Sequence, residues 1–265
     1  MSARYDCTDG QQKEAGLVAA VTAVQHGGLV VLPTDTVYGI GADAFTPSAI
    51  SALLAAKGTG RNVPPPVLVG SVRAASALAE SLGAFGQDLI DEFWPGPLTL
   101  VFRASPTLKW DLGDTRGTVA VRMPLHPVAL ELLRRTGPMA VTGANKHGEP
   151  AATTAADAEA QFGAAVSVYL DGGPCADSAQ STIVDLTSSV PRVLRSGVIT
   201  ADQIRKVVPL IELEPHIAPE NAEPETPEAA GVPEAADSLQ AAEAEPEVKP
   251  AQPHPLDGGA EETGS

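Results

Sequence analysis

The sequence predicts a single α/β domain with a twisted, mixed or mostly antiparallel sheet flanked by helices, and a disordered acidic tail after it. Two observations predict the domain: short apolar runs typical of strands interleave with segments of helical periodicity, and glycine or proline separates them. The uneven distribution of charge predicts the tail. We place the domain at residues 10–208 and the tail at residues 211–265.

The domain elements follow in chain order from these signals. Residues 12–26 carry an apolar helix face and end at a Gly-Gly pair, which stops a helix. The β-branched run at 29–32 is stopped by Pro33, because proline cannot donate to a strand ladder. The same reasoning predicts further helices at 47–57, 73–82, 87–93, 127–135, 154–162 and 201–207, and further strands at 67–70, 98–102, 119–122, 139–142, 166–171, 182–185 and 192–194.

The tail holds 14 of the 33 acidic residues and one of the 17 basic residues, so its net charge is −13 and the rest of the chain carries −3. It has no aromatic residue and nine prolines. Such a segment cannot bury enough apolar surface to offset its chain entropy. A disordered appendage is therefore favoured; a partner-binding tail is the alternative, without a motif to support it.

Composition also bears on the compartment. The two cysteines, Cys7 and Cys175, lack metal-ligand spacing and indicate a reducing environment, and Cys7 is expected near a mobile N-terminus. No stretch reaches the roughly 18 apolar residues of a membrane span, and the N-terminus lacks an apolar signal core. We expect a cytoplasmic protein without membrane contact.

The stretch from Val30 to Ala44 is the first candidate site. A strand ends there in Thr34, Asp35 and Thr36, and Tyr38, Gly39 and Gly41 follow. Strand ends of this kind bind ligands in α/β proteins, and glycines allow close approach of the backbone. The alternative is a tight turn whose hydroxyl groups only cap the backbone.

Basic and polar residues follow other predicted strands and the second helix, and arginine forks match phosphate oxygens. For each of them taken singly, a solvated surface charge is the alternative. The common phosphate-loop motifs, a Ser-His-Asp arrangement and a histidine metal cluster are all absent from the sequence. The residues concerned are Lys57, Arg61, Arg122, Asn145, Lys146, Ser181, Thr182, Arg195 and Ser196.

The order of motifs resembles the YrdC-like family of L-threonylcarbamoyladenylate synthases, in its short, single-domain form. The motifs are PTDTVYGIGADA (33–44), AAKG (55–58), FWPGPLTLVF (93–102), TVAVRMPLHP (118–127), GAN (143–145), STIVDLT (181–187) and VLRSGVIT (193–200). The segment PPPVLVGS after the lysine is similar to the actinobacterial branch.

The resemblance implies an enzyme that condenses L-threonine, bicarbonate and ATP with Mg²⁺ into L-threonylcarbamoyl-adenylate and pyrophosphate. This product serves N6-threonylcarbamoyladenosine formation at position 37 of tRNA, so tRNA would be an indirect partner. It also implies site residues. Thr34, Tyr38 and Ser181 would meet threonine; Lys57, Arg61, Thr118, Arg122, Asn145 and Arg195 would meet the nucleotide; Lys57 and Arg61 would be catalytic; and the protein would supply no metal ligand.

Three departures from the family pattern affect this site map. Thr59 takes the place of the arginine in Lys-x-Arg, so Arg61 is expected to replace it. Gly70 takes the place of a histidine, and Gly143 that of a serine, for which Thr142 is a candidate replacement.

Two other functions stay open at this point: an RNA-binding module of the same fold with lost or weak catalysis, and a carbamoyl-adenylate enzyme of hydrogenase maturation. The net charge of −3 and the lack of zinc-finger cysteines argue against them.

Overall fold

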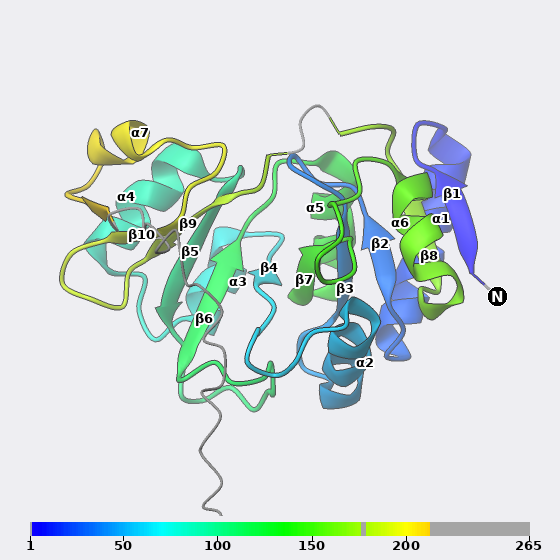
Figure 1. Ribbon diagram of the computed structural model, residues 1–265, viewed down its shortest axis with the longest axis horizontal. Coiled ribbons are helices and arrows are strands. Elements are labelled where there is room, and N and C mark those ends of the chain that lie inside the picture. Colours follow the sequence, from blue (N-terminus) through cyan, green and yellow to red (C-terminus); the bar gives the residue numbers. More distant parts are fainter. Residues whose placement is uncertain (1, 176–178, 213–265) are drawn as a thin grey trace, which may run out of the picture. The chain divides into compact units, whose positions relative to one another are not determined.

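The computed structural model describes residues 2–175 and 179–212, and the predicted tail beyond residue 212 lies outside them. The described chain forms a mixed sheet of eleven strands in the order β1-β8-β2-β3-β7-β4-β6-β5-β9-β10-β11 (Figure 1). The strands are β1 (Ala3–Asp6), β2 (Val30–Leu32), β3 (Gly39–Asp43), β4 (Val67–Leu68), β5 (Leu98–Arg103), β6 (Thr118–Arg122), β7 (Met139–Gly143), β8 (Val168–Asp171), β9 (Thr182–Asp185), β10 (Arg192–Arg195) and β11 (Ile211–Glu212).

Helix α2 shows the expected signals at both of its ends. Helix α2 has Pro47 in its first turn and ends at Gly58, whose left-handed backbone (φ 69°) closes the helix directly after Lys57. The helices are α1 (Gly10–Gln25), α2 (Pro47–Lys57), α3 (Val72–Leu78), α4 (Gly83–Phe93), α5 (Pro127–Thr136), α6 (Ala155–Phe162) and α7 (Ala201–Arg205), with a short 3₁₀ turn at Gly163–Ala165.

Strand pairing confirms the predicted mixed sheet. Five pairings are parallel, such as β5 with β9, and five are antiparallel, such as β3 with β7. The strand ends that carry polar residues therefore meet although they lie far apart in the sequence.

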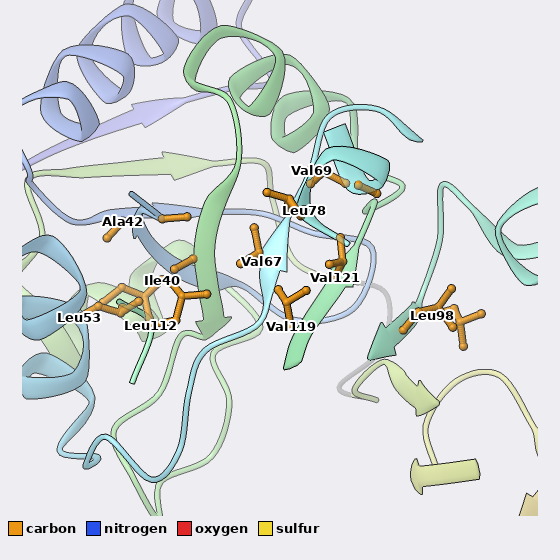
Figure 2. Close-up of a cluster of buried hydrophobic side chains, with 14 of the residues drawn as sticks. Ile40, Ala42, Leu53, Val67, Val69, Leu78, Leu98, Leu112, Val119 and Val121 are labelled. Carbon is orange, nitrogen blue, oxygen red and sulfur yellow. The ribbon is translucent and has the colours of Figure 1, made fainter. Parts of the chain in front are cut away.

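Two apolar clusters cover opposite faces of the sheet. In β2, Val30 and Leu32 belong to a cluster with α1 and α5, and Val31 belongs to the larger cluster with α2, α3, α4 and α6. All three side chains are fully buried, as expected for a short β-branched run covered on both faces. Figure 2 shows part of the larger cluster, where Val67 and Val121 of the central strands lie near Leu78 of α3.

Strand β3 corrects the interpretation of the Val30–Ala44 stretch. Gly39 and Gly41 were expected in a ligand-binding loop, but they lie in a strand between β2 and β7. Of the two, Gly39 still lines the cavity described below, and Gly41 does not. A Cβ atom at Gly41 would come within 2.7 Å of Val141 Cγ2, and one at Gly39 within 2.6 Å of Val141 Cγ1. These glycines make room for Val141 of the neighbouring strand.

The sheet also extends beyond residues 10–208. Strand β1 pairs with β8, and the Cys7 amide donates to the Asp171 carbonyl, so the expectation of a mobile segment around Cys7 is wrong. Strand β11 pairs with β10 after residue 208. Both are short edge strands whose pairing depends on distant residues, which local periodicity does not reveal. Helix α3 ends at Leu78, four residues earlier than predicted, because Ala79 bridges to Ala104.

Candidate active site

A cavity of about 390 Å³ opens beside the middle of the sheet. Its walls come from the segment after β2, the end of α2 and the loop after it, the start of β5, the ends of β6 and β7, and residues 180–195. Among the predicted site residues, it is lined by Thr34, Tyr38, Lys57, Arg122, Asn145, Ser181 and Arg195. The cavity thus collects seven of the nine residues that the resemblance implied.

Thr34 opens a hydrogen-bonded turn at the cavity wall. Its hydroxyl donates to the Val37 carbonyl (2.6 Å) and accepts from the Thr36 amide (3.2 Å), while the Thr36 hydroxyl lies 3.1 Å away. A threonine hydroxyl has one proton, so the proton of Thr34 is committed to the turn. The capping interpretation of this stretch therefore holds for the Thr34 hydroxyl, although the residue still lines the cavity.

Arg122 and Asp35 form a buried ion pair behind this turn. The guanidinium donates to Asp35 Oδ1 (2.6 Å), to Thr36 Oγ1 (3.0 Å) and to the Gly96 carbonyl (3.0 Å). Arg122 is 6% exposed, and its pKa is lowered by burial against the opposing effect of Asp35. All three donor nitrogens have protein partners, so Arg122 holds the turn and the strand ends together while contributing positive charge to the cavity.

Tyr38 contributes its ring rather than its hydroxyl. The hydroxyl donates to the Gly173 carbonyl (2.6 Å) and accepts from the Gly172 amide (3.0 Å). Burial raises the pKa of this phenol well above its usual range. The residue fixes the loop after β8 and forms part of the cavity wall.

Lys57 points its ammonium group at the segment after β7. The nitrogen donates to the Gly143 carbonyl (2.7 Å), to the Asn145 carbonyl and to Asn145 Oδ1 (3.2 Å). Burial lowers the pKa of Lys57 to about 8. The cavity therefore contains a cation whose charge is lost at a pH more than two units lower than that of an ordinary lysine.

Ser181 and Arg195 meet at the other side of the cavity. Arg195 donates to the Ser181 carbonyl (2.8 and 3.1 Å), to Ser181 Oγ (3.0 Å) and to Gln180 Oε1 (2.6 Å). The pKa of Arg195 is lowered by burial and then by the positive charge of Arg122. Lys57, Arg122 and Arg195 thus place three cations around the cavity. Among the described residues of its lining there is no carboxylate, which suits a phosphate-bearing ligand.

Arg61 and Thr118 are not brought into the cavity lining. Arg61 is exposed and makes a bidentate pair with Asp111 (2.7 and 3.0 Å), with Asp114 at 3.7 Å. Arg61 was expected to replace the phosphate-binding arginine that is absent at position 59, but its side chain does not line the cavity. Thr118 donates to the Thr115 carbonyl (2.8 Å) at the start of β6, away from the end of that strand at which Arg122 lies.

The three departures have local explanations. A Cβ at position 70 would lie 3.0 Å from the Arg134 amide of α5, so glycine there allows close packing of that helix. A Cβ at Gly143 would lie 3.0 Å from Asn145 Oδ1. Thr59, in the place of the family's arginine, and Thr142, next to the Gly143 that takes the place of a serine, both line the cavity.

Sequence reasoning missed Thr99 and Gln180, which line the cavity, and named Thr36 only as part of the Val30–Ala44 stretch. Thr36 and Thr99 stand inside the motifs PTDT and GPLT, and buried hydroxyls within such motifs were the available signal. Gln180 stands one residue before the STIVD motif and had no signal of its own.

The described residues contain no group of three or more His, Cys, Asp or Glu side chains placed to hold a metal ion. In the same part of the chain, no helix is long and apolar enough to cross a membrane.

Comparisons with known proteins agree with this geometry. The family model Sua5_yciO_yrdC, described as telomere recombination, matches residues 22–197. A Mycobacterium tuberculosis protein named "Putative threonylcarbamoyl-AMP synthase" is 54% identical over 208 residues, which are 78% of this chain and 96% of the relative. The threonylcarbamoyl-AMP synthase of Bacillus subtilis is 32% identical, over 80% of this chain and 62% of its own length.

A solved structure extends the comparison to a ligand complex. The Pyrococcus abyssi Sua5 structure with L-threonine aligns with a TM-score of 0.72 and 32% identity, over 80% of this chain. This chain spans 62% of the length of that protein. Together with the family model and the mycobacterial relative, this likeness shows that the chain belongs to the Sua5/YciO/YrdC family.

Proposed function

We propose that the chain condenses L-threonine, bicarbonate and ATP into L-threonylcarbamoyl-AMP and pyrophosphate, a nucleotidyl transfer that supplies N6-threonylcarbamoyladenosine synthesis on tRNA in the cytoplasm. One observation carries the proposal: Thr34, Lys57, Ser181 and Arg195, which come from separate parts of the sequence, line one cavity. The names of the relatives and the threonine-bound neighbour support it.

The reaction needs no covalent enzyme intermediate. The threonine amine condenses with bicarbonate to a carbamate, with loss of water. A carbamate oxygen then forms a bond to the α-phosphorus of ATP, and the bond from that phosphorus to the pyrophosphate oxygen breaks. Negative charge increases on the phosphoryl oxygens and on the departing pyrophosphate, so fixed cations and positioning supply the catalysis.

The cavity offers what these steps require. Its volume of about 390 Å³ lies within the usual range of ligand sites, about 300–1,000 Å³. Lys57, Arg122 and Arg195 would offset phosphate charge, and the threonine and serine hydroxyls would orient the polar groups of the amino acid. Mg²⁺ would enter with ATP as part of the substrate, held by the phosphates.

Arg61 keeps its predicted catalytic role within the proposal. Its loop runs from Gly58 to Pro66, and Thr59 and Val63–Pro66 of that loop line the cavity. Binding of ATP would have to exchange the carboxylates of Asp111 and Asp114 for phosphate oxygens. Both partners are solvent-exposed, so this exchange costs little.

The deciding experiment is mass-spectrometric detection of threonylcarbamoyl-AMP in a mixture of the full chain with ATP, Mg²⁺, L-threonine and bicarbonate. Pyrophosphate release should stop when threonine is omitted. Lys57→Ala should abolish release, and the matched variant Lys109→Ala, which removes an exposed lysine outside the cavity, should not. Full activity of Lys57→Ala would contradict the proposed phosphate site.

An RNA-binding module without catalysis is not favoured. The relatives carry the names of synthases, and the net charge through residue 210 is −3. If the chain releases pyrophosphate but causes no gel shift of tRNA, the RNA-binding module is contradicted.

A further inference from the structure

Two hydroxyl groups at the cavity wall share one hydrogen bond. Thr99 Oγ1 and Ser181 Oγ lie 2.9 Å apart, and the distance alone allows either to donate. Both residues line the cavity and are buried, with 2% and 6% of their surface exposed. Each hydroxyl carries one proton. Because neither makes a hydrogen bond to another acceptor among the described residues, one of the two protons is left over for a ligand.

The contact with Arg195 determines which of the two hydroxyl groups keeps a proton without a protein acceptor. Its guanidinium donates to Ser181 Oγ at 3.0 Å and is held in place by two bonds to the Ser181 carbonyl. A hydroxyl that accepts from a charged donor becomes a stronger donor itself, so the chain Arg195 to Ser181 to Thr99 is favoured. In this chain the Ser181 proton faces Thr99, and the Thr99 proton has no protein acceptor.

We infer that Thr99 is a ligand-contacting residue whose hydroxyl donates to a carboxylate oxygen of L-threonine, with Ser181 relaying the polarisation from Arg195. The identity of this ligand rests on the proposed function. A donor in a cavity that Arg195 and Arg122 also line suits an anionic oxygen. Thr34 cannot serve in the same way, because its proton is donated to the Val37 carbonyl.

Loss of the Thr99 hydroxyl and loss of the Ser181 hydroxyl should weaken L-threonine binding to different extents. Removing the Thr99 hydroxyl removes the donor that touches the ligand. Removing the Ser181 hydroxyl breaks the relay but leaves the Thr99 proton in place. If Ser181 were instead the residue that donates to threonine, the order of the two effects would be reversed.

The test is calorimetric titration of the full chain with L-threonine. Thr99→Val should weaken binding about tenfold and Ser181→Ala about threefold. Thr99→Ser, which keeps the hydroxyl and loses the methyl group, should bind within about twofold of the wild type. Thr136→Val is the control, because that hydroxyl bonds to the Leu132 and Gly137 carbonyls outside the cavity. Its threonine affinity should not change.

Thermal unfolding of each variant checks that it folds, and Thr99→Ala, with the same expected tenfold loss, replaces Thr99→Val if that variant does not. Wild-type affinity in Thr99→Val or Thr99→Ala overturns the inference, as does a loss in Ser181→Ala that equals or exceeds the loss in the Thr99 variant. Absence of L-threonine binding by the wild-type chain overturns the proposed function, and this inference with it.

Discussion

The three cations of the cavity differ in how their charge is balanced. Arg122 has a carboxylate partner, Arg195 bonds to a carbonyl, a hydroxyl and an amide oxygen, and Lys57 donates to carbonyl oxygens only. A buried cation without a counter-ion is the one whose protonation responds most to burial. Lys57 is therefore the residue through which pH should act on the site.

Nucleotide binding should show this response. The ammonium form of Lys57 exists below its pKa of about 8 and is lost as the pH rises through that value. ATP affinity of the free protein, measured by titration calorimetry between pH 7 and pH 9.5, should thus fall above about pH 8. Lys57→Arg keeps its charge over this range, so its ATP affinity should stay flat. A flat profile for the wild type would contradict a phosphate contact by Lys57.

The buried Asp35–Arg122 pair predicts a large effect on stability. Asp35→Ala leaves the Arg122 guanidinium buried without its counter-ion and frees the Leu125 amide. Loss of one partner of such a pair costs about 3 kcal/mol of the free energy of unfolding, measured in urea. Asp111→Ala is the matched control, since it breaks an ion pair whose members are both exposed, and its unfolding midpoint should not move measurably. Equal effects of the two variants would contradict this distinction.

In strand β3, packing against the neighbouring strand β7 explains why position 41 is a glycine. Gly41 lies opposite Val30 of β2 and Val141 of β7, and the side chain of Val141 occupies the place of a Cβ. Glycine at position 41 therefore reflects close packing within the sheet. It also explains why β3 has too few side chains to be recognised as a strand from its sequence.

Gly41→Ala should destabilise the fold by overpacking, at a cost of about 1–3 kcal/mol measured by urea unfolding. In the double variant Gly41→Ala/Val141→Ala the added methyl group gains space, so its loss of stability should be smaller than the sum of the single losses. Gly10→Ala is the control, because nothing lies within 4 Å of a Cβ at that position in the first turn of α1. Additive losses in the double variant would show that Val141 is not the obstacle.

Among the residues that the structure describes, those that line the cavity or form the sheet all precede residue 213. The cavity lining runs from Thr34 to Arg195, and the last strand ends at Glu212. A chain truncated after Glu212 should therefore keep the melting temperature and the L-threonine affinity of the full chain. Its isoelectric point should rise, because the removed residues 213–265 carry 13 acidic residues and one lysine. A lower melting temperature would show that the tail contributes to the fold.

The sequence by itself determined the α/β class, the mixed sheet, most of the helices and the family, because apolar periodicity, glycine and proline stops and motif order are local properties. Of the nine site residues that the family resemblance implied, seven line the cavity. Only the tertiary structure decided what each of them does: Arg122 bonds to Asp35, Arg61 to Asp111, and Ser181 to both Thr99 and Arg195. Most of these partners lie 50 to 87 residues apart in the chain. Local pattern cannot encode such pairings, because the order of strands in the sheet sets which hydroxyl, carboxylate and guanidinium groups come within hydrogen-bonding distance.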